Sequence, residues 1–533
     1  MRLTHARAWA LALTAFAAAG AAHAGGPDVH ALTEVKIVVG PGQTIEKGTV
    51  VIRDGVIEAV GADVAPPADA RVWEKEELTV YPGLIDAYVE RSWPAKKDDD
   101  DGGEGAHENS LVRPERAMSR FGADEGKAKK LREAGVTTAV VTPEEGLFRG
   151  SSVVVNLGEG GPNDNILRAD HAQNVTFATT GGFGNGYPGS LMGSVALFRQ
   201  TLLDARWHEK AWAAYNAKPS QKRPAMNAAL AALSDVANGR ELVVIEGDDA
   251  GDALRSAAMI EEFGLEAHLV GSGDEYQWLD EIAAIGAPVI LPINLPDLPD
   301  PPDEDDMVLS LDDLRHWDRA PGNAKELLDA GVTVAFTTHG LDDPKKVLSN
   351  LWQATDRGGL SADEALAAFT TTPAGLLGIS DRAGTITAGK MANLVIVEGD
   401  LFAEKPAVRE VWVDGHRFEI KESKPAEVEP AGTWNLTVTT GDGQTLPAVM
   451  ILTGEADSLE GTISDPEGNQ VPISSATVSG TKLEIVFDGT PYGMPGDIEF
   501  DLNIEGDSGS GDGMSPAGPF TIKGTREAPE VTR

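Results

Sequence analysis

The sequence predicts an α/β protein: an eight-stranded (β/α)8 TIM-type barrel, a β-sandwich beside it, and an extra C-terminal all-β domain. Over residues 81–379, compact apolar runs alternate with amphipathic helical stretches, which is typical of parallel strands buried on both faces. Short β-rich runs flank this region at 31–80 and 382–418. From 431 to 527 apolar and polar residues alternate between frequent turns, which indicates a separate all-β domain.

The barrel elements follow from the change in hydrophobic period along the chain. The predicted strands include 136–141, 241–245, 267–270, 288–291 and 332–336. The predicted helices include 123–134, 195–217, 249–263, 275–284 and 343–356. Ser361 followed by Glu364 is a capping box that opens a further helix. The number and length of these units fit a closed barrel better than an open sheet.

Turn signals and composition separate the remaining segments. Asp54-Gly55 lies between two β-rich runs and predicts a hairpin. Residues 292–306 are rich in Pro and Asp, and they predict a long loop at the barrel mouth. Residues 421–430 are charged and contain Pro, which predicts a linker before the all-β domain.

The first residues predict export. Arg2 and Arg7 are followed by a short apolar run over 8–22 and by an Ala-His-Ala cleavage site. Residues 1–24 therefore predict a signal peptide, and the mature protein is expected to begin near Gly25 in a periplasmic or secreted location. The run is too short to span a bilayer as a stable helix.

Charge and cysteine content narrow the function classes. The chain has 44 Lys and Arg against 84 Asp and Glu, a net charge of −40. Such a surface repels phosphate backbones and anionic lipids, which argues against nucleic-acid and membrane partners. The absence of cysteine excludes disulfides, thiolate metal sites and cysteine nucleophiles.

Several motifs follow one another over residues 31–418: a β-rich run at 50–61, a strand at 81–90, a segment at 187–204, a helix at 359–366 and 372–378, and a β-rich return at 384–395. In this order they resemble the opening sheet, first barrel strand, a barrel segment, last helix and return to the sheet of the amidohydrolase superfamily. The nearest likeness is to imidazolonepropionase-like and related exported members. Asn393 stands where the family usually has Asp. The resemblance implies that 31–80 and 382–418 fold together, and that one or two divalent metals hydrolyse a carbon–nitrogen or related bond. An Asp after the last strand would take the proton of metal-bound water.

The metal-ligand positions depart from this pattern. The first strand normally ends in His-x-His, because residues i and i+2 share a face and can hold one metal together. This chain has Tyr88 and Glu90 there. The fifth-strand position falls at Glu246, and the sixth offers no ligand, although His268 lies close by. The last-strand Asp is replaced by His339.

Two functions remain open at this point. In the first, the site is degenerate, and the protein is a non-catalytic or weakly active homologue that binds a small molecule or partners an active relative or a second copy. In the second, Glu90, Glu246 and His339 form an atypical zinc or manganese site, with Tyr88 and His268 lining the substrate pocket. His339 would then be the catalytic candidate of a hydrolase acting on non-peptide amide or cyclic amide bonds.

Overall fold

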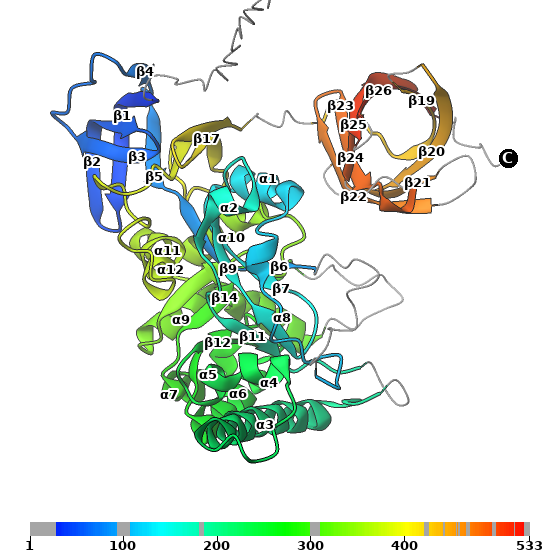
Figure 1. Ribbon diagram of the computed structural model, residues 1–533. Coiled ribbons are helices and arrows are strands. Elements are labelled where there is room, and N and C mark those ends of the chain that lie inside the picture. The colour runs from blue at the N-terminus through cyan, green and yellow to red at the C-terminus, as the bar shows by residue number, and fades with distance from the viewer. Residues whose placement is uncertain are drawn as a thin grey trace, which may run out of the picture. The chain divides into compact units, whose positions relative to one another are not determined.

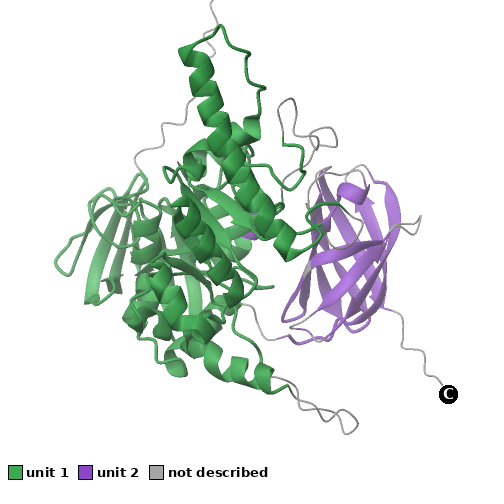
Figure 2. Cartoon of the chain, turned by 90° about the horizontal axis from the view of Figure 1, so that it is seen from below, with its two compact units in different colours: residues 1–124, 128–418 green, residues 125–127, 419–533 purple. Residues whose placement is uncertain are grey.

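The computed structural model describes two compact units, residues 1–124 with 128–418 and residues 125–127 with 419–533 (Figure 2). The described residues are 28–92, 107–180, 186–298, 310–420, 426–440, 443–454, 456, 459–464, 470–492, 497–515 and 518–526. The predicted signal peptide, half of the predicted linker and part of the 292–306 loop lie outside them. In the described part, no helix is both long and apolar enough to cross a membrane.

One eight-stranded sheet joins both ends of the first unit (Figure 1). In spatial order its strands are β18 (His416–Glu419), β17 (Ala407–Val413), β16 (Leu394–Glu398), β5 (Leu78–Pro82), β1 (Val29–Gly40), β2 (Gln43–Arg53) and β3 (Val56–Gly61), with β4 (Arg71–Glu74) paired to the start of β1. The sequence predicts a sandwich here, whereas the structure connects all these strands in a single sheet. The hairpin at Asp54-Gly55 is confirmed: it joins β2 to β3, and both residues have positive φ.

The central region contains two further sheets. The first has the order β10 (Ile166–Arg168), β9 (Val153–Asn156), β7 (Val136–Pro143) and β6 (Leu84–Arg91). The second has the order β15 (Val334–Thr337), β14 (Val289–Pro292), β13 (Glu266–Val270), β12 (Leu242–Glu246), β11 (Gln173–Thr176) and β8 (Phe148–Ser151). β6 pairs in parallel with β7, and β11 to β15 are all parallel.

These strands do not form the single closed ladder that the sequence predicts. Between β7 and β11 the chain makes three short strands, β8, β9 and β10, each of which pairs antiparallel with a neighbour. These three strands interrupt the parallel ladder between β7 and β11. On the other side, β6 and β15 are joined by side chains: the Thr338 hydroxyl donates to Asp86 (2.5 Å), and the Thr337 hydroxyl donates to the Tyr88 carbonyl.

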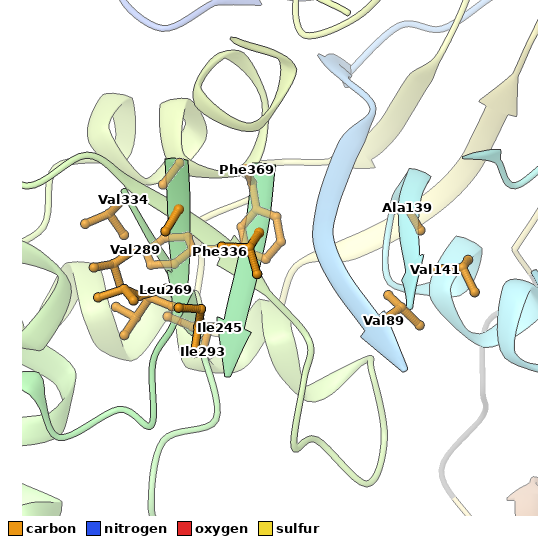
Figure 3. Packing of buried hydrophobic residues seen from close by; sticks show 14 of the residues in the cluster. Val89, Ala139, Val141, Ile245, Leu269, Val289, Ile293, Val334, Phe336 and Phe369 are labelled. Atoms are coloured by element: carbon orange, nitrogen blue, oxygen red, sulfur yellow. The ribbon is translucent and has the colours of Figure 1, made fainter. Parts of the chain in front are cut away.

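Helices surround these strands in the first unit. They are α1 (Glu125–Glu133), α2 (Pro162–Asn165), α3 (Leu191–Ala217), α4 (Ala228–Ala232), α5 (Ser234–Ala237), α6 (Ala250–Phe263), α7 (Leu279–Ile285), α8 (Leu311–Arg319), α9 (Asn323–Asp329), α10 (Lys346–Asp356), α11 (Ala362–Phe369) and α12 (Thr371–Leu376), with 3-10 turns η1 (Met118–Arg120), η2 (Glu275–Trp278) and η3 (Ala320–Gly322). The predicted capping box opens α11: Ser361 accepts from the Glu364 amide, and Glu364 accepts from the Ser361 amide. Alternate strand residues such as Ile245, Leu269 and Phe336 belong to one buried apolar cluster (Figure 3).

The second unit is a closed antiparallel barrel of eight strands (Figure 1). They are β19 (Gly432–Thr440), β20 (Thr445–Thr453), β21 (Glu460–Ser464), β22 (Gln470–Ser479), β23 (Lys482–Asp488), β24 (Asp497–Glu505), β25 (Ser508–Ser515) and β26 (Gly518–Arg526), with η4 (Thr490–Tyr492) between β23 and β24. Its interior is filled by apolar side chains, including the buried Trp434, Leu483 and Phe500. On β25, glycine is required at Gly513, because a Cβ there would lie 2.2 Å from the Phe520 ring.

We expect the second unit to fold by itself. Its apolar cluster contains only its own residues, and the barrel also holds the end of the predicted linker: the Glu427 amide donates to Gly480, and the Trp434 indole donates to Pro430. A fragment of residues 427–533 should therefore give β-type circular dichroism and one cooperative melting transition. A fragment that remains unstructured would contradict the predicted boundary.

Candidate functional site

The end of β6 aims two polar side chains at the interior of the first unit. Val89 points into the apolar cluster beside Val141 of β7 (Figure 3), so Tyr88 and Glu90, which alternate with it, project from the opposite face. β6 also lies close to β7 at its start. A Cβ on Gly83 would lie 2.2 Å from the Thr137 hydroxyl oxygen, so only glycine fits there.

Glu246 and His339 reach the same place from other strands. Glu246 is the last residue of β12, and His339 follows β15 by two residues. Because the carboxyl ends of parallel strands adjoin, these side chains meet Glu90, and one ligand atom from each of the three lies within 4.8 Å of the others. His339 Nδ1 is 3.5 Å from Glu90 Oε2, and its Nε2 is 3.6 Å from Glu246 Oε1. The structure therefore brings together the three residues that the sequence proposes as metal ligands.

Arg149 lies between the two carboxylates. It comes from β8, and its Nη1 donates to Glu90 Oε1 (2.8 Å), to the Tyr88 hydroxyl (2.8 Å) and to Glu246 Oε2. Its side chain is only 8% exposed. Burial opposes its charge, but Tyr88, Glu246 and Glu90 together raise its pKa above the usual value. Arg149 is thus a buried permanent cation that holds one oxygen of each carboxylate.

Tyr88 is a buried part of this network. Its hydroxyl donates to Glu246 Oε2 at 2.6 Å, and its ring meets the His339 ring edge-on with centroids 5.3 Å apart. Burial, together with Glu246 and Glu90, raises the pKa of Tyr88 well above its usual value. The phenol therefore stays protonated and remains a donor.

Glu90 is the partly exposed carboxylate of the network, with 20% of its side chain exposed. Burial raises its pKa, and Glu246 raises it further, while Arg149 and His339 act against this. Raised carboxylate pKa values often occur at functional sites, because such sites can require a carboxylate that is buried or close to another carboxylate.

Asp86 fixes the backbone beneath the network. Its Oδ2 accepts from the Thr338 amide (3.1 Å) and hydroxyl, and its Oδ1 accepts from the Tyr88 amide (3.1 Å). The side chain is fully buried, and burial raises its pKa. These bonds hold the end of β6 against the end of β15, and so set the position of Glu90 relative to His339.

His268 lies one layer below the site. On β13 it is paired with Val244, whereas Glu246 is paired with Val270, two residues further along the strand. Burial lowers the pKa of His268 to about 4. His268 therefore faces the interior, as its alternation with Leu269 predicts. It lies two residues before the end of β13, so it is deeper along the strands than Glu90, Glu246 and His339.

Comparisons with known proteins agree with this architecture. Residues 186–418 match the model of the amidohydrolase family. Within the first unit, this stretch is therefore similar to the amidohydrolase family. The chain is also 34% identical to amidohydrolase tasK of Hapsidospora irregularis over 98 residues, which are 18% of this chain and about a tenth of that relative's length. Among solved structures, an amidohydrolase from Thermotoga maritima MSB8 has a TM-score of 0.58 at 18% identity, covers 73% of this chain and is itself covered to 99%; this likeness shows the fold.

Members of the amidohydrolase superfamily are usually metal-dependent, and Glu90, Glu246 and His339 are the candidate ligands here. Three protein ligands meet the number that a catalytic zinc site uses. However, Arg149 already takes one oxygen from each carboxylate. A divalent ion about 5 Å from a guanidinium is repelled by roughly 7 kcal/mol at an effective dielectric constant of about 20, which offsets part of its attraction to the carboxylates. The residues in this arrangement therefore do not fit a divalent metal well.

Proposed function

We propose that the first unit is a non-catalytic or weakly active amidohydrolase homologue that binds a small molecule where β6, β12 and β15 end. The contacts of Arg149 with Glu90, Glu246 and Tyr88 carry this proposal. A guanidinium between two carboxylates supplies positive charge at the place where the superfamily usually has a metal. It cannot supply a metal-bound hydroxide, so the usual nucleophile is lost.

The same proposal includes the barrel. We infer that the two central sheets form one distorted (β/α)8 barrel, joined at β6 and β15 by Asp86, Thr337 and Thr338. The antiparallel strands β8 to β10 would then be a local modification of the family's barrel. This modification supports the functional proposal, because β8 is the strand that brings Arg149 to the site.

A second candidate function is a hydrolase of carbon–nitrogen bonds with an atypical site. The observation that favours it is the partial exposure of Glu90 and His339, at 20% and 23%, beside the buried Arg149. A carboxylate whose pKa is raised accepts a proton more readily than an ordinary one, and a guanidinium can stabilise an oxyanion. Hydrolysis of a model amide that His339→Ala abolishes at unchanged stability would support this alternative.

Metal content distinguishes the two functions. We expect the protein, purified without chelator, to contain far less than one equivalent of zinc or manganese and to stay folded when chelator is added. The variant Tyr88→His/Glu90→His/His339→Asp/Arg149→Met restores the family's residues at three positions and removes the cation, and it should gain about one equivalent of metal. The matched control keeps Arg149 in the triple variant, which should bind metal more weakly. Stoichiometric metal in the unmodified protein, measured by plasma mass spectrometry, would contradict the proposal.

A further inference from the structure

The exposed side of α3 carries no acidic residue, although the chain as a whole is strongly acidic. α3 lies at the lower edge of the first unit (Figure 1), and α4 and α5 pack against it. Its exposed residues are apolar, neutral or basic, and its two acidic residues, Asp204 and Glu209, are half-buried. In a chain with 84 acidic and 44 basic residues, a face of this kind allows another acidic surface to approach closely.

Six of the exposed residues form one seam along this helix. They are Ala196, Gln200, Leu203, Trp207, Lys210 and Ala214. They recur at alternate spacings of four and three residues, which is the spacing with which one long helix packs along another. At the middle of the seam, Leu203 is 45% exposed and Trp207 is 64% exposed. Large apolar side chains that gather on an exposed face are typical of an interaction surface.

The seam is complementary to itself when a second copy runs antiparallel. If a two-fold axis lies level with Ala205, residues equally far before and after it face each other across the axis. The facing pairs are Leu203 with Trp207, Gln200 with Lys210, and Ala196 with Ala214. The two large apolar residues thus meet at the centre, and small residues meet at both ends. The Gln200 amide nitrogen donates to Asp204 (2.8 Å), so its carbonyl oxygen can accept from the Lys210 ammonium of the second copy.

The charges at the two ends of α3 are also complementary in this register. From residue 210 to residue 234 the chain has four basic residues and no acidic one. Three of them follow the end of α3: Lys218, Lys222 and Arg223. The antiparallel register places this segment beside the start of α3 in the second copy. There the Tyr187 carbonyl accepts from Asn109 (2.7 Å), which directly follows the exposed Glu108. A basic segment of each copy therefore meets an acidic residue of the other.

We propose that two copies of this chain associate through α3, antiparallel to each other and about a two-fold axis level with Ala205. At 1.5 Å per residue, the seam from Ala196 to Ala214 is about 27 Å long. One helix pair with short flanking segments buries less than the roughly 1,200–2,000 Å² of a stable interface, so the dimer should be reversible and form at micromolar concentrations. At about 0.15 M salt, repulsion between the other acidic surfaces is screened beyond about 8 Å.

Sedimentation equilibrium of the full-length protein tests the association. Between about 1 and 300 μM at 0.15 M salt, the mean mass should rise from one chain towards two. Leu203→Glu and Trp207→Glu each place two charges at the centre of the contact and should weaken association by at least about tenfold. Leu311→Glu, at an exposed leucine of α8, is the matched control and should leave it unchanged. A monomer at every concentration, or a dimer that neither α3 variant weakens, would overturn the proposal.

The register can be tested with introduced thiols, because the chain has no cysteine. In Ala196→Cys/Ala214→Cys, a short bis-maleimide should join two copies, since these positions face each other in the proposed dimer. The single variants should not be joined, because identical positions then lie about 27 Å apart along the helices. Circular dichroism confirms that each variant is folded. If a single variant is cross-linked as efficiently as the double variant, the antiparallel register is wrong.

A basic helix face with an exposed tryptophan can also bind an anionic lipid surface. The same protein is therefore centrifuged with phosphatidylcholine vesicles that contain about 30% phosphatidylglycerol. We expect the protein to remain in the supernatant, because charge and seam together match a second copy. Sedimentation with these vesicles that Trp207→Glu abolishes would assign the face to a membrane and overturn the proposal.

Discussion

Arg149→Met should lower the free energy of unfolding of the first unit by about 3–5 kcal/mol, because it removes the guanidinium that pairs with the buried Glu246 and the partly exposed Glu90. Methionine retains much of the apolar length of the arginine side chain, so the loss reports mainly on charge and hydrogen bonding. Glu90, Glu246 and the Tyr88 hydroxyl each lose a donor in this variant. Urea denaturation at neutral pH, followed by tryptophan fluorescence, measures the change.

Two further variants control this experiment. Arg149→Met/Glu246→Gln removes one of the stranded carboxylates and should recover part of the lost stability, as expected for residues that interact directly. Arg240→Met removes an exposed arginine that pairs with Glu209 and Asp235 and should change stability little. If the single Arg149→Met variant were as stable as the unmodified protein, the carboxylates would not depend on the guanidinium.

Acid should destabilise the first unit through two buried histidines. Burial lowers the pKa of His171 to about 3, with contributions from Arg168 and His268, and burial lowers the pKa of His268 to about 4. In the unfolded chain both titrate near pH 6.5. As the pH falls below 6.5, the unfolded state therefore binds protons that the folded state does not. The two histidines together should cost about 3 kcal/mol of stability between pH 6.5 and pH 5.

The variant His171→Leu/His268→Leu isolates this contribution. The carboxylates titrate in both proteins, so the difference between their pH dependences reports on the histidines. We expect the variant to lose about 3 kcal/mol less stability than the unmodified protein on going from pH 6.5 to pH 5. Leucine is acceptable at 171, because His171 Nδ1 has no hydrogen-bond partner among the described residues. Identical pH dependences would show that the histidines are protonated in the folded state.

Much of the site was predictable because strand ends are easy to recognise. Glu90, Glu246 and His339 each stand at or just after the end of an apolar run. The resemblance to the family singled out these positions, and parallel strands place such ends together, so the meeting of the three residues could be expected. The level of His268 was harder to predict. Alternation shows that it faces the interior, but the register of β13 against β12 decides its depth, and short apolar runs do not encode register.

Arg149 could not be predicted from the same pattern. Arg149 lies in β8, a four-residue strand that pairs antiparallel with β11, where the alternation of parallel strands and helices is broken. The one indication of Arg149 in the sequence is that a charged residue follows Phe148 in a short stretch. The contacts of the Tyr88 hydroxyl with Glu246 and Arg149 also could not be predicted, because they depend on where β8 and β12 lie relative to β6.

The sheet shared by both ends of the first unit also affects how the protein is made. β5 obtains its partner β16 only when the chain has been synthesised far beyond it, and the nearby bond from Tyr81 to Asp400 spans 319 residues. At about 5–20 residues per second, roughly 15–60 seconds of translation separate the two strands. Until then one edge of β5 lacks its partner, so a nascent chain remains incompletely folded through most of its synthesis. An unpaired strand edge can pair with another chain, so misassembly is most expected during this interval of synthesis.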